Sequence, residues 1–264
     1  MKFFNYCSSN SVKALLLTLS SLILAACIVP SSIKQAAVLS HPTLDTLIPQ
    51  LLTADYILLG EEHDQPKIHL FRARLLKELA KHRSLLVSVE HITSDKQPIL
   101  DANLAHPQEL QRALDWNKSG WPKWSMFLPL FEALRDTRAI VRCGNRRTTD
   151  TFDDLIPYGL NAPLPHETRL REELEKMHPP SMKIPLERMV LAQRRRDAAL
   201  AVSLDQGKAT MRILLAGNGH IRKDYGVPWY IRYHNPEARV LAIGIISGTE
   251  ANKDKGVYDY LVRL

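Results

Sequence analysis

The sequence predicts an α/β fold, mainly a parallel sheet flanked by helices, with a smaller helical cap or insert. Two observations support this fold class. Short apolar runs of strand length alternate with segments whose apolar residues recur at helical spacing. The connections between successive runs are long enough to hold the crossover helices that parallel strands require. A chain of 264 residues, of which 45% are hydrophobic, can also bury a sizeable core.

The first elements form a strand–helix–strand unit. Residues 56–59 (Tyr-Ile-Leu-Leu) predict a buried strand. Pro66 then suits the first turn of a helix, and the apolar residues from Ile68 to Leu79 keep helical spacing. The run Leu-Leu-Val-Ser-Val at residues 85–89 predicts a second strand. We expect these two strands to lie parallel, because a helix separates them.

The remaining chain repeats this alternation. Residues 139–143, 213–216 and 240–246 predict three more strands, and residues 127–134 and about 186–204 predict helices. The stretch from about residue 150 to residue 185 departs from the pattern, because it contains six prolines and one short charged helix at residues 168–177. It is interpreted as an insert that either caps the ends of the strands or runs over the surface.

The first 26 residues predict a lipoprotein signal peptide. Lys2 and Lys13 are their only charges, and the apolar run from Ala14 to Leu24 is too short to span a bilayer comfortably. The sequence Leu-Ala-Ala-Cys at residues 24–27 resembles a bacterial lipobox, so Cys27 is the expected lipidation site, carrying palmitate or a similar acyl chain. An ordinary secretory signal is the alternative. Residues 27–40 are expected to be a tether and residues 41–264 the folded domain, held at the bacterial outer membrane.

Charge and cysteine content narrow the classes of partner. The formal net charge is +7, and it falls to +5 when residues 1–26, with their two lysines, are removed. Basic residues are spread along the chain among 28 acidic ones, which argues against a nucleic-acid partner and favours small anions. Cys143 would be the one free thiol of the processed protein, so no internal disulfide is expected.

Polar residues follow each predicted strand. Ligands of open parallel sheets bind at the carboxyl ends of the strands, where such residues meet. Turns that serve structure alone favour Gly, Asn, Asp and Ser, whereas acids and imidazoles recur here. We therefore expect a converging site made of Glu61, His63, Glu90, Asn145 and His220.

Two kinds of chemistry fit these residue types. His63, His220 and Glu61 are ligands suited to Zn²⁺, Mn²⁺ or Fe²⁺, with positions left open for water. Alternatively, His63 acts as a general base oriented by Glu90, in a hydrolase site completed by Glu61 and His220. The sequence has no HExxH, no GxSxG and no P-loop, and no GxGxxG follows the first strand, so the usual zincin, serine-hydrolase and nucleotide-binding motifs are missing.

Several short motifs, in this order and spacing, carry a family resemblance. They are Gly-Glu-Glu-His at residues 60–63, Val-Glu at 89–90, Trp-Pro-Lys-Trp at 121–124, Gly-Asn-Arg-Arg at 144–147, Gln193 to Asp197, Ala-Gly-Asn-Gly-His at 216–220 and Tyr-Gly-Val-Pro at 225–228. Over about residues 45–247 the chain resembles the ChaN family of haem-binding lipoproteins. This family is similar in turn to the Tiki metalloproteases and the erythromycin esterases.

The resemblance implies a function and a set of ligands. It implies a lipid-anchored protein of haem or iron uptake or storage, which binds haem in a pocket shared with a second copy and works with an outer-membrane haem receptor. An axial tyrosine is implied, and the candidates are Tyr225 and Tyr158, with His220 as competing ligand and Arg146 and Arg147 for the haem propionates. The alternative is a metal-dependent or Glu/His-based hydrolase of the Tiki or erythromycin esterase type.

Overall fold

The computed structural model describes residues 37–40, 43–178, 182–248 and 256–264. The expected signal peptide, the lipidation site Cys27 and most of the expected tether lie outside the described residues. Residues 37–40, which the sequence assigns to the end of the tether, form strand β1 (Ala37–Ser40) instead. The segment from Ile33 to Leu264 is one compact unit. Among the described residues, no helix has the length and apolar character needed to cross a membrane.

A sheet of seven strands runs through the described part of the chain, in the order β1-β7-β6-β2-β5-β3-β4. Every pairing in it is parallel, which confirms the predicted α/β fold. The other strands are β2 (Tyr56–Leu59), β3 (Leu85–Thr93), β4 (Ile140–Asn145), β5 (Met211–Leu215), β6 (Val240–Ile246) and β7 (Tyr260–Arg263).

The inner strands are continuous apolar runs because helices cover both faces of the sheet. All four residues of β2 are buried, as are the first eight of β3. Strand β3 continues four residues beyond its predicted end at Val89, and its pairing with β4 shifts register between Val89 and Thr93. Glu90 and His91 therefore belong to the strand itself.

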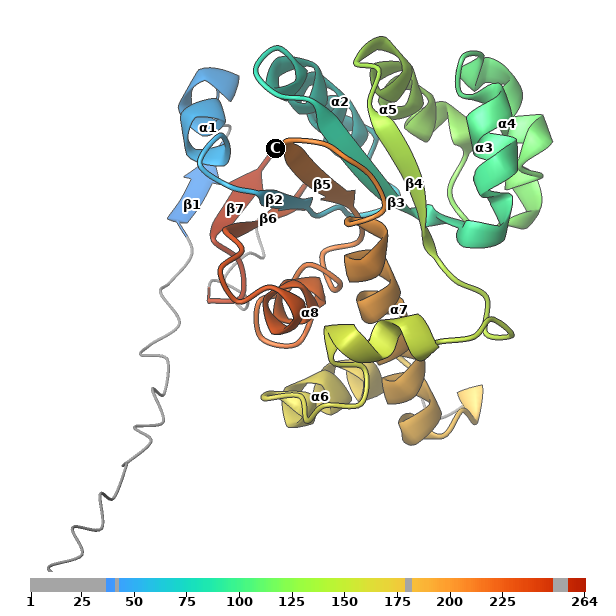
Figure 1. Ribbon diagram of the computed structural model, residues 1–264, viewed down its shortest axis with the longest axis vertical. Coiled ribbons are helices and arrows are strands. Elements are labelled where there is room, and N and C mark those ends of the chain that lie inside the picture. The colour runs from blue at the N-terminus through green and yellow to red at the C-terminus, as the bar shows by residue number, and fades with distance from the viewer. Residues whose placement is uncertain (1–36, 41–42, 179–181, 249–255) are drawn as a thin grey trace, which may run out of the picture. The chain divides into compact units, whose positions relative to one another are not determined.

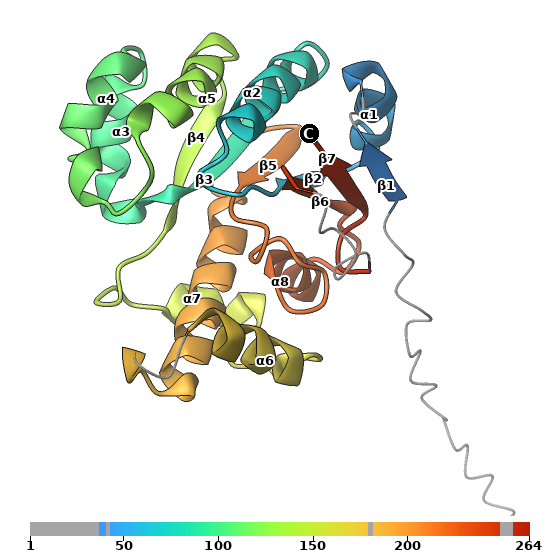
Figure 2. The ribbon, with the colours of Figure 1, turned by 180° about the vertical axis from the view of Figure 1, so that it is seen from behind.

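Helices lie on both faces of the sheet (Figures 1 and 2). One hydrophobic core lies under α1, α2, α3, α4 and α5, and the second lies under α6, α7 and α8. The helices on the first face are α1 (Leu44–Leu51), α2 (Pro66–Ala80), α3 (Gln97–Asn103), α4 (Pro107–Ala113) and α5 (Trp124–Asp136), with the short 3-10 turns η1 (Ser94–Lys96) and η2 (Trp116–Lys118). Those on the second are α6 (Glu167–Met177), α7 (Leu186–Ser203) and α8 (Val227–His234), with η3 (Asp153–Tyr158).

Helix α2 begins at Pro66, as predicted, and buries the predicted apolar residues Ile68, Leu75 and Leu79. The same buried face also carries two polar side chains, His69 and Arg72. Their burial has a functional consequence, because both reach the carboxyl end of β2.

The insert of about residues 150–185 contains η3 and α6. It packs on α7 and α8, the helices of the second face. Arg194 of α7 fastens it by donating to the carbonyl oxygens of Leu160 and Ala162 and by pairing with Glu167. The insert therefore extends the helical layer, and its residue Phe152 lines a cavity beside the ends of the strands.

Candidate functional site

The carboxyl ends of three neighbouring strands bring predicted site residues together. β2, β5 and β3 lie side by side, and the last residues of β2 and β5 are opposite one another. Because these strands end at the same level, the segments that leave them start next to each other. The side chains that gather there come from Glu61, His63, Glu90, His91 and His220.

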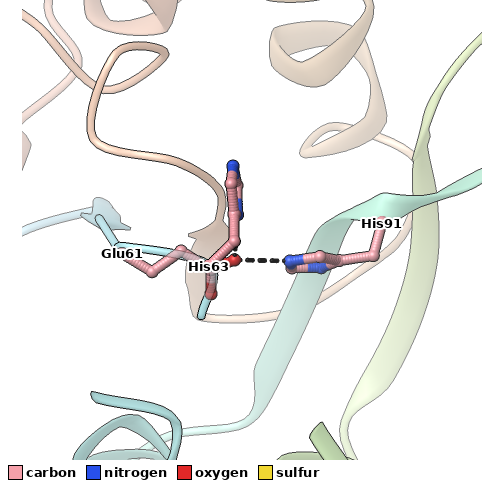
Figure 3. Close-up of side chains that lie close together, drawn as sticks. All are labelled: Glu61, His63 and His91. Atoms are coloured by element: carbon pink, nitrogen blue, oxygen red, sulfur yellow. Dashed lines mark hydrogen bonds and ion pairs between the residues drawn. The ribbon is translucent and has the colours of Figure 1, made fainter. Parts of the chain in front are cut away.

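The Glu61 carboxylate is the centre of the first group, the Glu61 cluster, which consists of Glu61, His63, His69, Arg72 and His91 (Figure 3 shows three of them). Its Oε1 lies 2.6 Å from His63 Nδ1 and 2.6 Å from His91 Nε2. Its Oε2 pairs with the Arg72 guanidinium and lies 3.4 Å from His69 Nδ1. All these side chains are fully buried except that of His63, which is 38% exposed.

Burial keeps the imidazoles of this cluster neutral. It lowers the pKa of His69 to about 4 and that of His91 to about 3. Burial also lowers the pKa of Arg72, to about 9, so the guanidinium still carries its charge at neutral pH. One carboxylate and one guanidinium thus compensate each other, while three imidazoles stay uncharged around them.

The Glu61 carboxylate also sets the tautomer of His63. A carboxylate only accepts hydrogen bonds, so His63 Nδ1 and His91 Nε2 must both donate to it. His63 then presents a lone pair on Nε2, the form needed by a general base or a metal ligand. Glu61, His63 and His91 offer ligand atoms that all lie within 4.8 Å of one another. Two imidazoles and one carboxylate are ligands that divalent Zn, Mn and Fe accept.

A second group, the His220 cluster, consists of His220, Glu90, Asp197 and Gln193. His220 Nε2 lies 3.1 Å from Glu90 Oε1, and His220 Nδ1 lies 2.5 Å from Asp197 Oδ1. The amide nitrogen of Gln193 lies 3.2 Å from Asp197 Oδ2. The other Glu90 oxygen accepts from the backbone N–H of Gly217 at 2.8 Å. The imidazole of His220 is therefore held between two buried carboxylates.

These carboxylates keep His220 protonated. Burial alone would lower its pKa, but the charges of Glu90 and Asp197 outweigh burial and raise it to about 10. The same imidazolium holds the pKa of Glu90 well below its usual range, although burial acts in the opposite direction. The negative charges of Glu90 and Asp197 together stabilise the buried imidazolium of His220.

The two clusters meet at Gly217. A Cβ placed on this residue would lie 3.0 Å from both Cε1 and Nε2 of His63, so the absence of a side chain lets the imidazole approach. Burial lowers the pKa of His63, and the positive charge of His220 adds to this effect against the attraction of Glu90. A neutral, partly exposed imidazole thus lies beside a charged, buried one, an arrangement typical of acid–base chemistry.

The predicted ligand set differs from the set that the structure brings together. His220 belongs to the second cluster, and His91 takes the place beside Glu61 and His63. Likewise, Glu90 contacts His220, whereas the orienting carboxylate of His63 is Glu61. Successive residues of a strand point to opposite faces, so Glu90 reaches His220, on the side of α7, and His91 reaches Phe127 of α5. Asn145, at the end of β4, caps the backbone N–H of Arg146 and is not in either cluster.

Sequence reasoning missed His69, Arg72 and His91. A signal for Arg72 exists, because it stands four residues after Ile68 and three before Leu75, on the apolar stripe of α2. A charged residue on such a stripe indicates a buried partner. His91 follows the last residue of the predicted strand by two positions, and only the longer β3 turns it into the core.

The tyrosines proposed for haem lie in different places. The hydroxyl of Tyr158 donates to Asp205 at 2.6 Å, and its ring stacks on His234. The same Asp205 accepts from Tyr56, the first residue of β2, so Tyr158 lies at the amino ends of the strands. Tyr225 follows β5 at the carboxyl ends; burial raises its pKa, and its hydroxyl has no hydrogen-bond partner among the described residues.

Arg146 and Arg147, the predicted propionate partners, already have carboxylate partners. Arg146 binds Asp154 through both terminal nitrogens, and Arg147 pairs with Asp150 and Asp95. His220, the competing axial ligand, uses both ring nitrogens within its cluster. Tyr225 is thus the candidate haem ligand whose donor atom is not engaged.

Comparison with solved structures finds proteins of the same fold. A ChaN protein of Campylobacter jejuni, whose structure is described as showing cofacial haem binding, matches with a TM-score of 0.64 and 22% identity over 82% of this chain and 92% of that one. The type III effector HopBA1 matches with a TM-score of 0.50 and 17% identity over 83% and 92% of the two chains. At these identities the likeness shows the fold alone. The search of curated proteins found no matching sequence.

A family of protein sequences matches over most of the folded unit. Residues 47–231 match the family described as haem-binding uptake, Tiki superfamily, ChaN. This range contains both clusters, the insert and Tyr225. The chain therefore belongs to the haem-binding ChaN family of the Tiki superfamily.

Proposed function

We propose that this protein is a lipid-anchored haem-binding protein of the bacterial outer membrane, serving haem or iron uptake or storage. The observation that carries the proposal is membership of the haem-binding ChaN family over residues 47–231. The lipobox-like sequence at residues 24–27 supports the anchor at Cys27. As partners we propose a second copy of this chain, which completes the haem pocket, and an outer-membrane haem receptor.

Tyr225 is the axial ligand that we propose. A phenolate binds the ferric iron of haem, and its negative charge favours the ferric state. The guanidinium of Arg222 lies 4.8 Å from the ring centre of Tyr225, and its charge lowers the pKa of the phenol against the effect of burial. Arg222 thus offsets part of the rise that burial causes, whereas the pKa of Tyr158 is raised both by burial and by its hydrogen bond to Asp205.

A hemin titration tests the proposal. The chain without residues 1–27, which retains the compact unit from Ile33 onward, should give a saturable shift of the Soret band. The variant Tyr225→Phe should lose the ferric tyrosinate spectrum, whereas Tyr158→Phe should keep it. A wild-type shift no larger than that of an unrelated basic protein would contradict haem binding, and an unchanged spectrum in Tyr225→Phe would contradict the ligand. Size exclusion with and without hemin tests the dimer.

Labelling in bacteria tests the anchor. The full chain should incorporate radioactive palmitate and fractionate with the outer membrane. The variant Cys27→Ala should lose both properties, whereas Cys7→Ala should keep them. Labelling that survives Cys27→Ala would contradict the lipobox interpretation.

A hydrolase is the second function, favoured by one observation. The neutral His63 lies beside the protonated His220, with two carboxylates orienting these rings. In a metal-free enzyme of this kind His63 Nε2 would take a proton from water. In a metal-dependent one Glu61, His63 and His91 would instead hold a divalent ion, which would activate the water. The test is metal analysis together with esterase and peptidase assays. Activity equal in the wild type and His63→Ala would exclude this function.

A further inference from the structure

A cavity of about 410 Å³ opens between the chain that leaves β4 and the exposed side of α7. Five of its ten lining residues are arginines, and none is acidic. The remaining lining includes the apolar side chains of Phe152, Leu191 and Ala192. We call this cavity the arginine pocket.

One face of α7 supplies half of this lining. Arg188, Leu191, Ala192, Arg195 and Arg196 follow one another at steps of three, one, three and one residues, which places them on one side of a helix. The opposite side of α7 faces the core. The face of α7 that lines the pocket therefore combines positively charged and apolar side chains.

Three of the five arginines form no ion pair with a carboxylate of the described residues. Arg146 and Arg147 pair with Asp154 and Asp150, as described above. The side chains of Arg188 and Arg196 make no ion pair or hydrogen bond with the described residues. Arg195 lies 4.4 Å above the ring of Phe152, and its buried Nε has no hydrogen-bond partner in the described chain.

Three like charges around one cavity repel one another, and a bound anion would relieve this repulsion. Guanidinium groups bind carboxylates and phosphates through paired hydrogen bonds, which an ammonium group cannot match. The apolar side chains of the pocket would contact an uncharged body attached to such a head group. The combination therefore selects a ligand with one anionic end and one apolar end.

We propose that the arginine pocket binds an amphipathic anion, with its carboxylate or phosphate between Arg188, Arg195 and Arg196 and its apolar part against Phe152 and Leu191. The pocket lies next to the His220 cluster along α7, because its lining residue Arg196 directly precedes Asp197. This proposal does not depend on haem binding.

The test uses anilinonaphthalene sulfonate, an anionic apolar dye, with the soluble chain that starts at residue 28. Wild-type protein should bind the dye saturably. The double variant Arg188→Gln/Arg196→Gln should bind it at least about tenfold more weakly, because charge-assisted hydrogen bonds are lost. Phe152→Ala should weaken dye binding as well, because the apolar contact of the ring is lost. The control is Arg74→Gln, at an exposed position of α2, which should bind the dye like the wild type. Circular dichroism checks that each variant is folded.

Competition then distinguishes the two head groups. Dodecanoate and dodecyl phosphate, each below its micelle concentration, should displace the dye from the wild type, and the stronger competitor identifies the head group. Dodecanol, which has the same tail without charge, should not displace it. Equal displacement by dodecanol, or dye affinity that is unchanged in the double variant, would overturn the proposal.

Discussion

The two histidine clusters lie side by side at the same strand ends, yet they hold their imidazoles in opposite charge states. In the Glu61 cluster one carboxylate is shared by a guanidinium and three imidazoles, and burial keeps His69 and His91 neutral. In the His220 cluster two carboxylates contact one imidazole and raise its pKa to about 10, so it is protonated at neutral pH. The number of carboxylates per imidazole, rather than burial, decides the difference.

The contrast shows how one fold presents both a base and an acid. All four rings are buried or half-buried, so burial alone would make every one of them neutral. Only His220 gains enough negative charge nearby to reverse this. Substitutions in each cluster test this contrast.

Removing the charge of Glu61 should have the largest effect. In Glu61→Gln the buried Arg72 loses its counter-charge, so the free energy of unfolding should fall by about 3–5 kcal/mol. Urea denaturation measures it, and the exposed Glu237→Gln serves as the control. The double variant Glu61→Gln/Arg72→Met should recover part of the loss. A loss below about 1 kcal/mol in Glu61→Gln would mean that Arg72 does not depend on this carboxylate.

The Glu61 cluster should make the protein sensitive to acid. His69 and His91 bind protons more weakly in the folded state than at their ordinary pKa of 6.5. The stability they support is present above pH 6.5 and is lost as the pH falls toward 4, by up to about 1.4 kcal/mol per pH unit for each histidine. In His69→Gln the slope of unfolding free energy against pH should decrease in this range.

The exposed His82→Gln is the matched control and should leave the acid slope unchanged. Urea unfolding at a series of pH values measures both variants. An acid slope that is the same in His69→Gln and the wild type would show that His69 is not held neutral.

The His220 cluster should make the protein sensitive to alkali. The folded pKa of His220 is raised, so its contribution is complete below pH 6.5 and is lost as the pH rises toward 10, by up to about 1.4 kcal/mol per pH unit. In Asp197→Asn one of the two carboxylates is gone, so the pKa of His220 should fall. NMR titration of the His220 ring measures it. A titration midpoint unchanged by Asp197→Asn would assign the raised pKa to Glu90 alone.

The smallest effect is expected at Gly217, where the clusters meet. In Gly217→Ala the new Cβ would crowd the partly exposed ring of His63, and the free energy of unfolding should fall by about 1 kcal/mol. The NMR signals of His63 should shift, while the titration of His220 stays the same. Gly219→Ala is the control, because nothing lies within 4 Å of its Cβ position. Equal effects of the two substitutions would show that His63 does not approach Gly217 closely.

Much of the fold could be predicted from the sequence. β2 and β6 have the predicted bounds, and α2, α5 and α7 contain the predicted helical segments, because long apolar patterns determine these elements locally. β1 and β7 were not predicted. Both lie at one end of the sheet order, where β7 pairs with β6 on one side and, on the other, with β1 from the opposite end of the chain. The helices α1, α3, α4 and α8 were missed as well, because seven or eight residues give a weak helical periodicity.

The sequence by itself determined the class of fold and the types of residue that would meet at the strand ends, since both follow from local pattern and from the parallel connections. Only the tertiary structure decided which carboxylate contacts which imidazole. A single step along β3 sends Glu90 to one face and His91 to the other, and Arg72 and Asp197 arrive from helices on opposite faces of the sheet. The charge of a buried imidazole depends on such neighbours, because in the interior no water replaces a missing partner.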